Sequence, residues 1–177
     1  MPKFRNYITP TTLTLARNIR LAAFDVDGVM SDGTLAYTDS GSETKVFHTA
    51  DGQGLKSLAA AGTILAVVSA RHSEVVLRRT NELGITHLVQ ACPDKLAALT
   101  ALARSLNLEM AQCAFMGDDL ADLHAMKACG FACSVPHAPL VVQQWAHCVT
   151  RRNGGAGAVR EFCELLLRAR QRTSSFG

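Results

Sequence analysis

Two kinds of hydrophobic pattern alternate along the chain. Short apolar runs rich in β-branched residues predict buried strands, and longer stretches with apolar residues every three or four positions predict helices. We expect strands at 19–26, 63–69, 85–89, 113–116, 131–135 and 148–150. We expect helices at 55–61, 73–83, 94–106, 120–129, 140–146 and 158–170. This alternation predicts an α/β fold with an open, mostly parallel, Rossmann-like sheet and helices on both faces.

One segment interrupts the alternation. Apolar and polar residues at 34–37 and 43–49 flank the turn-forming sequence Thr-Asp-Ser-Gly-Ser, which predicts a β-hairpin inserted after the first strand, at about 34–49. Residues 1–18 contain four threonines, two prolines and three basic residues but no acid, so we expect a loose N-terminal segment there. A single domain is expected at 19–177, with a C-terminal helix and basic tail at about 156–177.

Composition and charge exclude several classes of protein. The 177 residues are 48% hydrophobic, which is enough for one core, and 18 basic against 15 acidic residues give a net charge of only +3. This balance does not indicate a nucleic-acid partner. No apolar run approaches the roughly 18 residues of a membrane span, and the N-terminus lacks the apolar stretch of a secretory signal. We therefore expect a cytoplasmic protein with no membrane partner.

The cysteine pattern is consistent with that expectation. Six cysteines are scattered without a CxxC pair, so neither a disulfide framework nor a zinc site is indicated. We expect reduced thiols, most of them buried.

Polar side chains follow four of the predicted strands. Because ligands of an open parallel sheet bind beyond the carboxyl ends of its strands, these side chains are expected to meet at one edge. Each taken alone has an ordinary explanation, such as a turn hydroxyl, a helix cap or a solvated lysine. In chain order they are Asp25 and Asp27, then Ser69, then Lys95, then Asp118, Asp119 and Asp122.

This set of residue types indicates metal-assisted phosphoryl transfer. Converging carboxylates repel one another unless a cation is present, and a site with oxygen ligands only favours Mg²⁺. Ser69 and Lys95 supply a hydroxyl donor and a positive charge for phosphoryl oxygens. In such reactions positioning and charge stabilisation provide most of the catalysis.

The motifs in their order resemble a known family. Asp25-Val26-Asp27-Gly28-Val29, Ser69, Lys95 and Gly117-Asp118-Asp119 are similar to the four motifs of the haloacid-dehalogenase-like phosphatases. Longer stretches at 24–33, 51–55, 83–88 and 154–161 resemble the capless members that hydrolyse 3-deoxy-D-manno-octulosonate 8-phosphate in lipopolysaccharide precursor synthesis. The resemblance implies a Mg²⁺-dependent phosphomonoesterase that forms an aspartyl-phosphate intermediate.

The resemblance also implies roles for single residues. Asp25 would be the nucleophile, and Asp27 would protonate the leaving alcohol and then activate water. Ser69 and Lys95 would bind the transferring phosphoryl group. Mg²⁺ would be held by the side chains of Asp25 and Asp118 and by the backbone carbonyl of Asp27, with Asp119 or Asp122 orienting the outer shell.

Further positions are implied for the sugar acid and for assembly. The hairpin would pack on a neighbouring subunit of a homotetramer and help to complete its active site. Relatives commonly have glycine where this chain has Ala70 and Ala91, and often Asn at position 48. The implied substrate-binding residues are Asp27, His48, Thr49, Ala50, Asp51, Gly52, Lys56, Arg71, Arg79 and Lys95.

Three alternatives remain open at this point. The same chemistry could act on a nine-carbon keto-deoxy sugar acid phosphate, which only the substrate contacts would distinguish. A receiver-type signalling domain also holds an aspartyl-phosphate on a parallel sheet. It places that aspartate on a middle strand, however, whereas Asp25 and Asp27 follow the first strand here. An inert scaffold is the third alternative, although every expected catalytic position is occupied.

Overall fold

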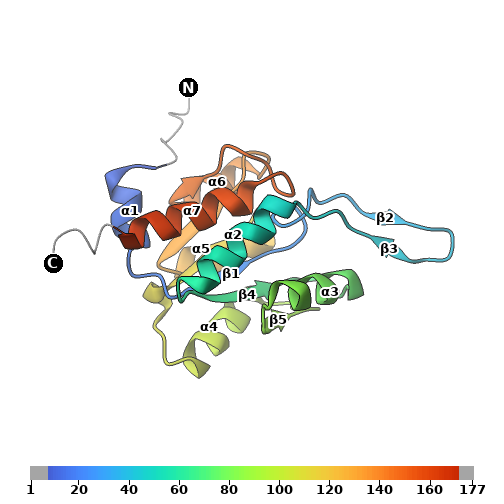
Figure 1. The fold of residues 1–177 in the computed structure, drawn as a ribbon, viewed down its shortest axis with the longest axis horizontal. Helices are drawn as coiled ribbons and strands as arrows, with labels where there is room; N and C mark the ends of the chain where they lie inside the picture. The colour runs from blue at the N-terminus through green and yellow to red at the C-terminus, as the bar shows by residue number, and fades with distance from the viewer. Residues whose placement is uncertain (1–7, 172–177) are drawn as a thin grey trace.

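The computed structural model describes residues 8–171 and contains a six-stranded parallel sheet (Figure 1). The strand order is β5-β4-β1-β6-β7-β8, and every neighbouring pair is parallel. All six predicted strands are therefore confirmed, and β1 lies in the centre of the sheet. The strands are β1 (Leu21–Phe24), β4 (Ile64–Val68), β5 (His87–Val89), β6 (Cys113–Met116), β7 (Phe131–Ser134) and β8 (Cys148–Val149).

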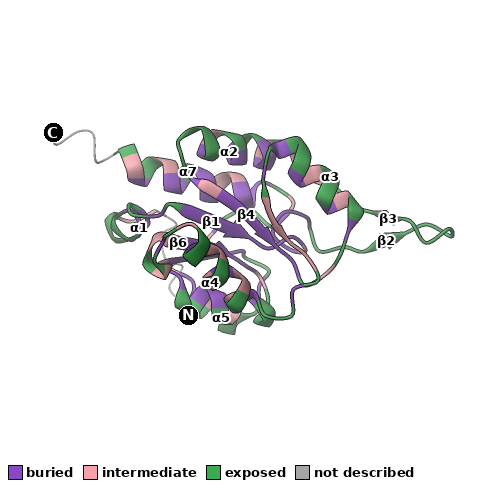
Figure 2. Cartoon of the chain, turned by 90° about the horizontal axis from the view of Figure 1, so that it is seen from below, coloured by how far each residue is buried: buried purple, intermediate pink, exposed green. Residues whose placement is uncertain are grey.

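Helices cover both faces of the sheet. Figure 2 shows α2, α3 and α7 on one side of the strands and α4 and α5 on the other. Ser73 and Asp94 cap α3 and α4 through their side chains, because each accepts a hydrogen bond from a backbone N–H of the first turn. The helices are α2 (Thr49–Ala60), α3 (Glu74–Leu83), α4 (Lys95–Ser105), α5 (Leu123–Ala128), α6 (Leu140–Trp145) and α7 (Ala158–Gln171), with short 3₁₀ helices at Met110–Gln112 and Leu120–Asp122.

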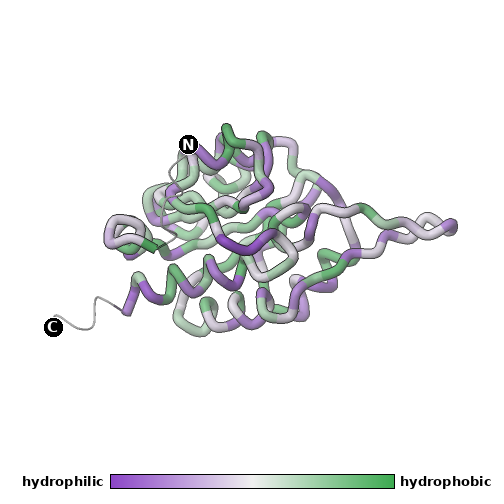
Figure 3. Tube along the Cα trace, turned by 90° about the horizontal axis from the view of Figure 1, so that it is seen from above, coloured by the Kyte–Doolittle hydropathy of each residue, from purple (hydrophilic) through white to green (hydrophobic). Residues whose placement is uncertain are grey.

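The core lies between the sheet and these helices. Every residue of β1, β6 and β7 is buried. Phe162 of α7 contacts Phe24 and Phe131, with ring centroids 5.8 and 6.2 Å apart. Polar and apolar stretches alternate along α7, so one face packs on the core and the other is solvated (Figure 3). All six cysteines are buried and free, as predicted, and no helix of residues 8–171 is long and apolar enough to cross a membrane.

The N-terminal segment differs from the expectation of a loose lead-in. Residues Pro10–Ala16 form α1, and Thr9 and Thr12 close a capping box at its start. Leu13 and Ala16 are buried, and α1 packs against α7. Two of the four threonines that suggested a loop, Thr9 and Thr12, therefore cap a helix. Residues 1–7 and the end of the predicted basic tail, 172–177, lie outside the described part of the chain.

The predicted hairpin is present but shorter than expected. Strands β2 (Ala36–Tyr37) and β3 (Glu43–Thr44) pair antiparallel and project away from the sheet (Figure 1). The expected second strand to residue 49 and the expected helix start at residue 55 were wrong, because α2 begins at Thr49. His48 caps this helix, since its Nδ1 accepts from the Ala50 N–H at 3.2 Å. Two glycines in the first turns conceal the helical pattern in the sequence.

Candidate active site

Asp25 and Lys95 meet at the carboxyl end of the sheet. Asp25 directly follows β1, and its N–H donates to the Met116 carbonyl at 3.0 Å, which continues the strand pairing up to this residue. Lys95 is the first residue of α4, and its Nζ lies 2.8 Å from Asp25 Oδ1 and 2.5 Å from Asp122 Oδ1. All three side chains are buried. A buried ammonium thus lies between two buried carboxylates.

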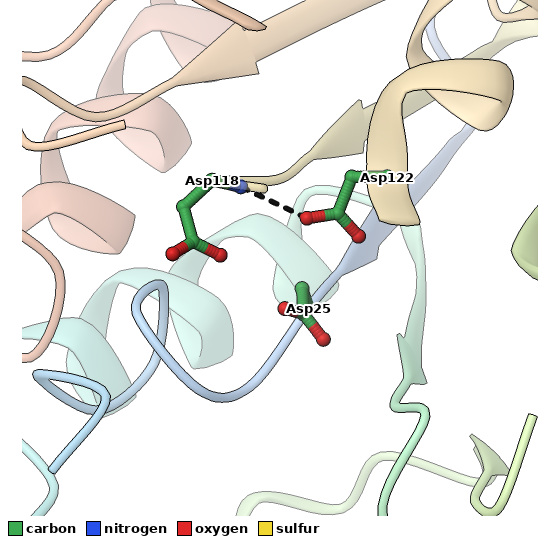
Figure 4. A group of neighbouring side chains, drawn as sticks. All are labelled: Asp25, Asp118 and Asp122. Atoms are coloured by element: carbon green, nitrogen blue, oxygen red, sulfur yellow. Dashed lines mark hydrogen bonds between the residues drawn. The ribbon is translucent and has the colours of Figure 1, made fainter. Parts of the chain in front are cut away.

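Asp122 turns back toward the loop that follows β6. Its Oδ2 accepts from the N–H groups of Asp118 and Asp119, at 2.9 and 3.1 Å (Figure 4 shows the first of these). Gly117 permits this geometry, because a Cβ there would come within 2.4 Å of the Asp122 Cβ. Asp119 itself caps the short helix that begins at Leu120. The loop is therefore held in the form that brings Asp118 toward Asp25.

The surroundings of the carboxylates in this cluster disfavour their charged forms. Burial, followed by the nearby charge of Asp122, raises the pKa of Asp25 to about 7, although Lys95 opposes the shift. Burial and the charges of Asp122 and Asp119 raise the pKa of Asp118 to about 7 as well. Burial alone would lower the pKa of Lys95, but the negative charges of Asp25 and Asp122 raise it. A further positive charge would relieve the carboxylates.

A divalent cation fits this position. One carboxylate oxygen from each of Asp25, Asp118 and Asp122 lies within 4.8 Å of the others. Asp118 Oδ1 is buried without a hydrogen-bond partner. Gly28, at φ +91°, leaves the space beside Asp118 open, because a Cβ there would lie 2.0 Å from Asp118 Oδ2. An oxygen-only donor set with an unpaired buried oxygen is suited to Mg²⁺.

Ser69 lies next to this cluster on the neighbouring strand. It follows β4, is buried, and is fixed by backbone hydrogen bonds to Val89 and Cys92 at 2.9 and 3.1 Å. Its Oγ accepts from the Arg71 N–H at 3.2 Å. Ala91 adopts a left-handed φ of +49°, a conformation that favours the glycine common at this position in relatives.

Asp27 lies outside the three-carboxylate cluster and contacts the root of the hairpin. Lys45 Nζ donates to Asp27 Oδ1, and Arg71 Nε lies 3.6 Å from Asp27 Oδ2. Glu43 pairs with both cations, at 3.2 Å from Lys45 and 3.3 Å from Arg71. Glu43 and Lys45 are not among the site residues predicted from the sequence. Their spacing of two places both on one face of a strand, but charges on a hairpin are usually solvated.

Asp51 and Gly52, two of the residues implied to bind the sugar acid, contact other elements of the described chain. Asp51 accepts from the N–H groups of Gly157 and Arg160, at 3.3 and 2.7 Å, and so caps the start of α7. Gly52 packs against the Arg79 guanidinium, which also lies over the Phe47 ring.

Within residues 8–171, only some of the implied residues are joined to Asp25 or Asp27 by a hydrogen bond or an ion pair. Arg71 and Lys95 are the implied residues that reach the two aspartates. The implied residues that do not are His48, Thr49, Ala50, Asp51, Gly52, Lys56 and Arg79.

Comparisons with known proteins agree with this geometry. Residues 88–162 match the haloacid dehalogenase-like hydrolase family. The 3-deoxy-D-manno-octulosonate 8-phosphate phosphatase KdsC of Yersinia pestis is 42% identical over 157 residues, covering 89% of this chain and 84% of that protein. The enzyme of the same name from Salmonella typhimurium is 39% identical over 163 residues, covering 92% and 86%.

Solved structures agree as well. The phosphatase of that name from Moraxella catarrhalis, in complex with a magnesium ion, a phosphate ion and KDO, superposes with a TM-score of 0.91 at 43% identity, covering 96% of this chain and 97% of that one. The cobalt-bound deoxy-D-mannose-octulosonate 8-phosphate phosphatase of Haemophilus influenzae gives a TM-score of 0.86 at 37% identity, covering 92% and 95%.

The parallel sheet, with aspartates after β1 and β6, defines a haloacid dehalogenase-like hydrolase. With relatives about 40% identical over most of its length, this chain belongs to the 3-deoxy-D-manno-octulosonate 8-phosphate phosphatase family within that class.

Proposed function

We propose that this chain is a Mg²⁺-dependent phosphomonoesterase that hydrolyses 3-deoxy-D-manno-octulosonate 8-phosphate to the free sugar acid and phosphate. The observation that carries the proposal is the buried cluster in which Lys95 joins Asp25 to Asp122 beside Asp118. Family membership supports the same activity, since relatives that match most of the chain bear this enzyme name. The reaction belongs to lipopolysaccharide precursor synthesis.

In this proposal Asp25 is the nucleophile. One of its oxygens attacks phosphorus, the bond to the leaving sugar oxygen breaks, and an aspartyl-phosphate forms. Asp27 gives a proton to the leaving oxygen and then takes one from the water that hydrolyses the intermediate. Lys95 and Ser69 bind the phosphoryl oxygens and stabilise the charge that they carry in the transition state. Lys95 is already within hydrogen-bond distance of Asp25, which places its charge at the reacting group.

The residues present fit a magnesium ion. The side chains of Asp25 and Asp118 and the backbone carbonyl of Asp27 would hold it, and Asp122 would orient Asp118 through its backbone N–H. The ion would supply positive charge that neutralises phosphoryl oxygens beside Asp25. The unpaired buried oxygen of Asp118 supports this ligand set.

Arg71 is the cation best placed for the carboxylate of the sugar acid. Its side chain is 41% exposed and lies beside Asp27, so it can contact both solvent and the substrate's leaving end. The roles of His48–Gly52, Lys56 and Arg79 stay predictions. A nine-carbon keto-deoxy sugar acid phosphate would use the same catalytic residues.

We also propose that the chain assembles as a homotetramer through the hairpin. The described chain has no second domain over Asp25 and Asp27, and phosphoryl transfer benefits from exclusion of water. The hairpin and its root expose Leu35, Tyr37 and Val46, at 44%, 57% and 75%, on a segment that projects from the sheet. Burial of these side chains against another copy would remove apolar surface from water. The cytoplasmic location stays a prediction.

Phosphate release from a panel of sugar phosphates tests this function. The panel contains the eight-carbon and nine-carbon keto-deoxy acid phosphates, each with Mg²⁺ and with EDTA, and Asp25→Asn is the blank. We expect Mg²⁺-dependent release with a preference for the eight-carbon acid. A preference for the nine-carbon acid would keep the mechanism and change the substrate. Absence of metal-dependent release from every compound would contradict the enzyme proposal.

A further inference from the structure

Four charged side chains at the root of the hairpin form a closed ring. Lys45 contacts Asp27 Oδ1 and lies 3.2 Å from Glu43 Oε1. Arg71 lies 3.6 Å from Asp27 Oδ2 and 3.3 Å from the same Glu43 oxygen. We call Asp27, Glu43, Lys45 and Arg71 the charge quartet. Each member has two neighbours of opposite sign, so the formal charges cancel around the ring.

Lys45 is the member with the least freedom. Its side chain is 0% exposed, whereas that of Arg71 is 41% exposed. An unpaired buried ammonium is strongly unfavourable, so Lys45 is bound to its two carboxylate partners. A charged Lys45 therefore stays beside Asp27 Oδ1.

Glu43 fixes Lys45 in turn. Glu43 accepts hydrogen bonds from the Ser73 hydroxyl and from Arg71, whose guanidinium also contacts the Tyr37 hydroxyl at 2.6 Å. Ser73 is the cap of α3. The quartet thus joins three separate segments: the loop after β1, the hairpin root and the start of α3.

We propose that Lys45, held by Glu43, is a positioning residue that fixes the Asp27 carboxyl group for proton transfer. Lys45 holds Oδ1, which leaves Oδ2 to face the leaving group once the exposed Arg71 moves to the substrate's carboxylate. The proton passes from Asp27 to the sugar oxygen as its bond to phosphorus breaks and the Asp25–phosphorus bond forms. Asp27 recovers a proton from the water that later attacks the aspartyl-phosphate.

The test separates substrates by their need for a proton. The alcohol of 3-deoxy-D-manno-octulosonate 8-phosphate leaves only with a proton, whereas p-nitrophenolate leaves without one. We expect Lys45→Met to lower kcat/KM for the sugar phosphate by about 30-fold and for p-nitrophenyl phosphate by less than about threefold, since general acid catalysis contributes to the first reaction only. Asp27→Asn should show the same selectivity, and Glu43→Gln a weaker form of it, about fivefold.

The matched control is Lys127→Met, which removes an exposed lysine that stacks on Trp145 and should leave both values unchanged. A lower fraction of folded enzyme reduces the apparent kcat/KM for both substrates by the same factor. The ratio of the two kcat/KM values therefore reports positioning alone. An unchanged ratio in Lys45→Met would overturn the inference. If circular dichroism shows that Lys45→Met is unfolded, the same ratio measured for Glu43→Gln tests the inference, and an unchanged ratio there would overturn it.

This inference rests on the proposed phosphatase activity, and the two failures are distinguishable. A wild-type chain that releases no phosphate from the sugar phosphate contradicts the function. An active wild type with an unselective Lys45→Met contradicts only the role of the quartet.

Discussion

The carboxylate cluster lies at the ends of strands that are buried along their whole length, whereas the neighbouring hairpin has two strands of two residues each, largely exposed. The cluster is positioned by the packing of β1 against β4 and β6, so its geometry follows from the core. The hairpin has no core of its own and is joined to the body through the quartet. Rigid strands suit chemistry that needs fixed distances, and an exposed arm suits contact with a partner.

The strongest test of this contrast is Asp25→Asn. The amide keeps the shape of the side chain but is not a nucleophile, so we expect turnover to fall by on the order of 10⁴-fold or more. The fold should persist, because the β1 backbone pairing does not depend on this side chain. Phosphate release and circular dichroism measure the two properties. Substantial residual turnover would remove Asp25 from the nucleophile role.

A smaller effect concerns the stability of the metal-free protein. The pKa values of Asp25 and Asp118 are both about 7 in the folded chain, above the ordinary value of 3.8. The folded state thus holds protons that the unfolded state releases, so stability falls as the pH rises from about 4 to 7 and levels off above that. Mg²⁺ should offset part of this loss, by on the order of 1–3 kcal/mol at pH 8 and by less at pH 5.

Urea unfolding with EDTA or Mg²⁺ at the two pH values measures this effect. Asp118→Asn should lose most of the Mg²⁺ dependence, whereas Asp39→Asn, at the exposed hairpin turn, should keep it. Equal stabilisation by Mg²⁺ at pH 5 and pH 8 would contradict the assignment of the cluster as the metal site.

The smallest expected effect on folding lies in the hairpin. Leu35→Ser combined with Val46→Ser should change the free energy of unfolding of the monomer by less than about 0.5 kcal/mol, because both side chains are exposed. The same change should dissociate the tetramer. Light scattering measures the assembly. Leu15→Ser is a matched control, since Leu15 on α1 is 43% exposed and Leu35 is 44% exposed. A fully active wild-type monomer would refute the tetramer proposal.

Local patterns predicted the parts of the molecule that local forces determine. The six strands and the set of aspartates at the sheet edge follow from periodicity and from the rule that ligands bind at strand ends. The same reasoning was wrong at residues 10–16 and 45–54. There α1 forms by packing on α7, and α2 begins in a segment with two glycines. Tertiary contacts outweighed local propensity in both places.

Arg71 and Asp51 lie in different environments in the structure. Both were implied as contacts of the sugar acid, but only Arg71 lies beside Asp27, while the Asp51 oxygens bind the start of α7. Their positions in the sequence do not distinguish these two environments, because each depends on a segment far away along the chain.

The sequence by itself determined the fold class, the placement of the catalytic motifs at the ends of strands and the oxygen-rich chemistry of the site, because these follow from periodicity and from residue type. Only the tertiary structure decided which charges pair: Asp122 with Lys95, and Lys45 with Asp27 across 18 residues of chain. Such pairs form where buried charges must find partners. The choice of partner is set by the packed positions of the segments, which no local pattern encodes.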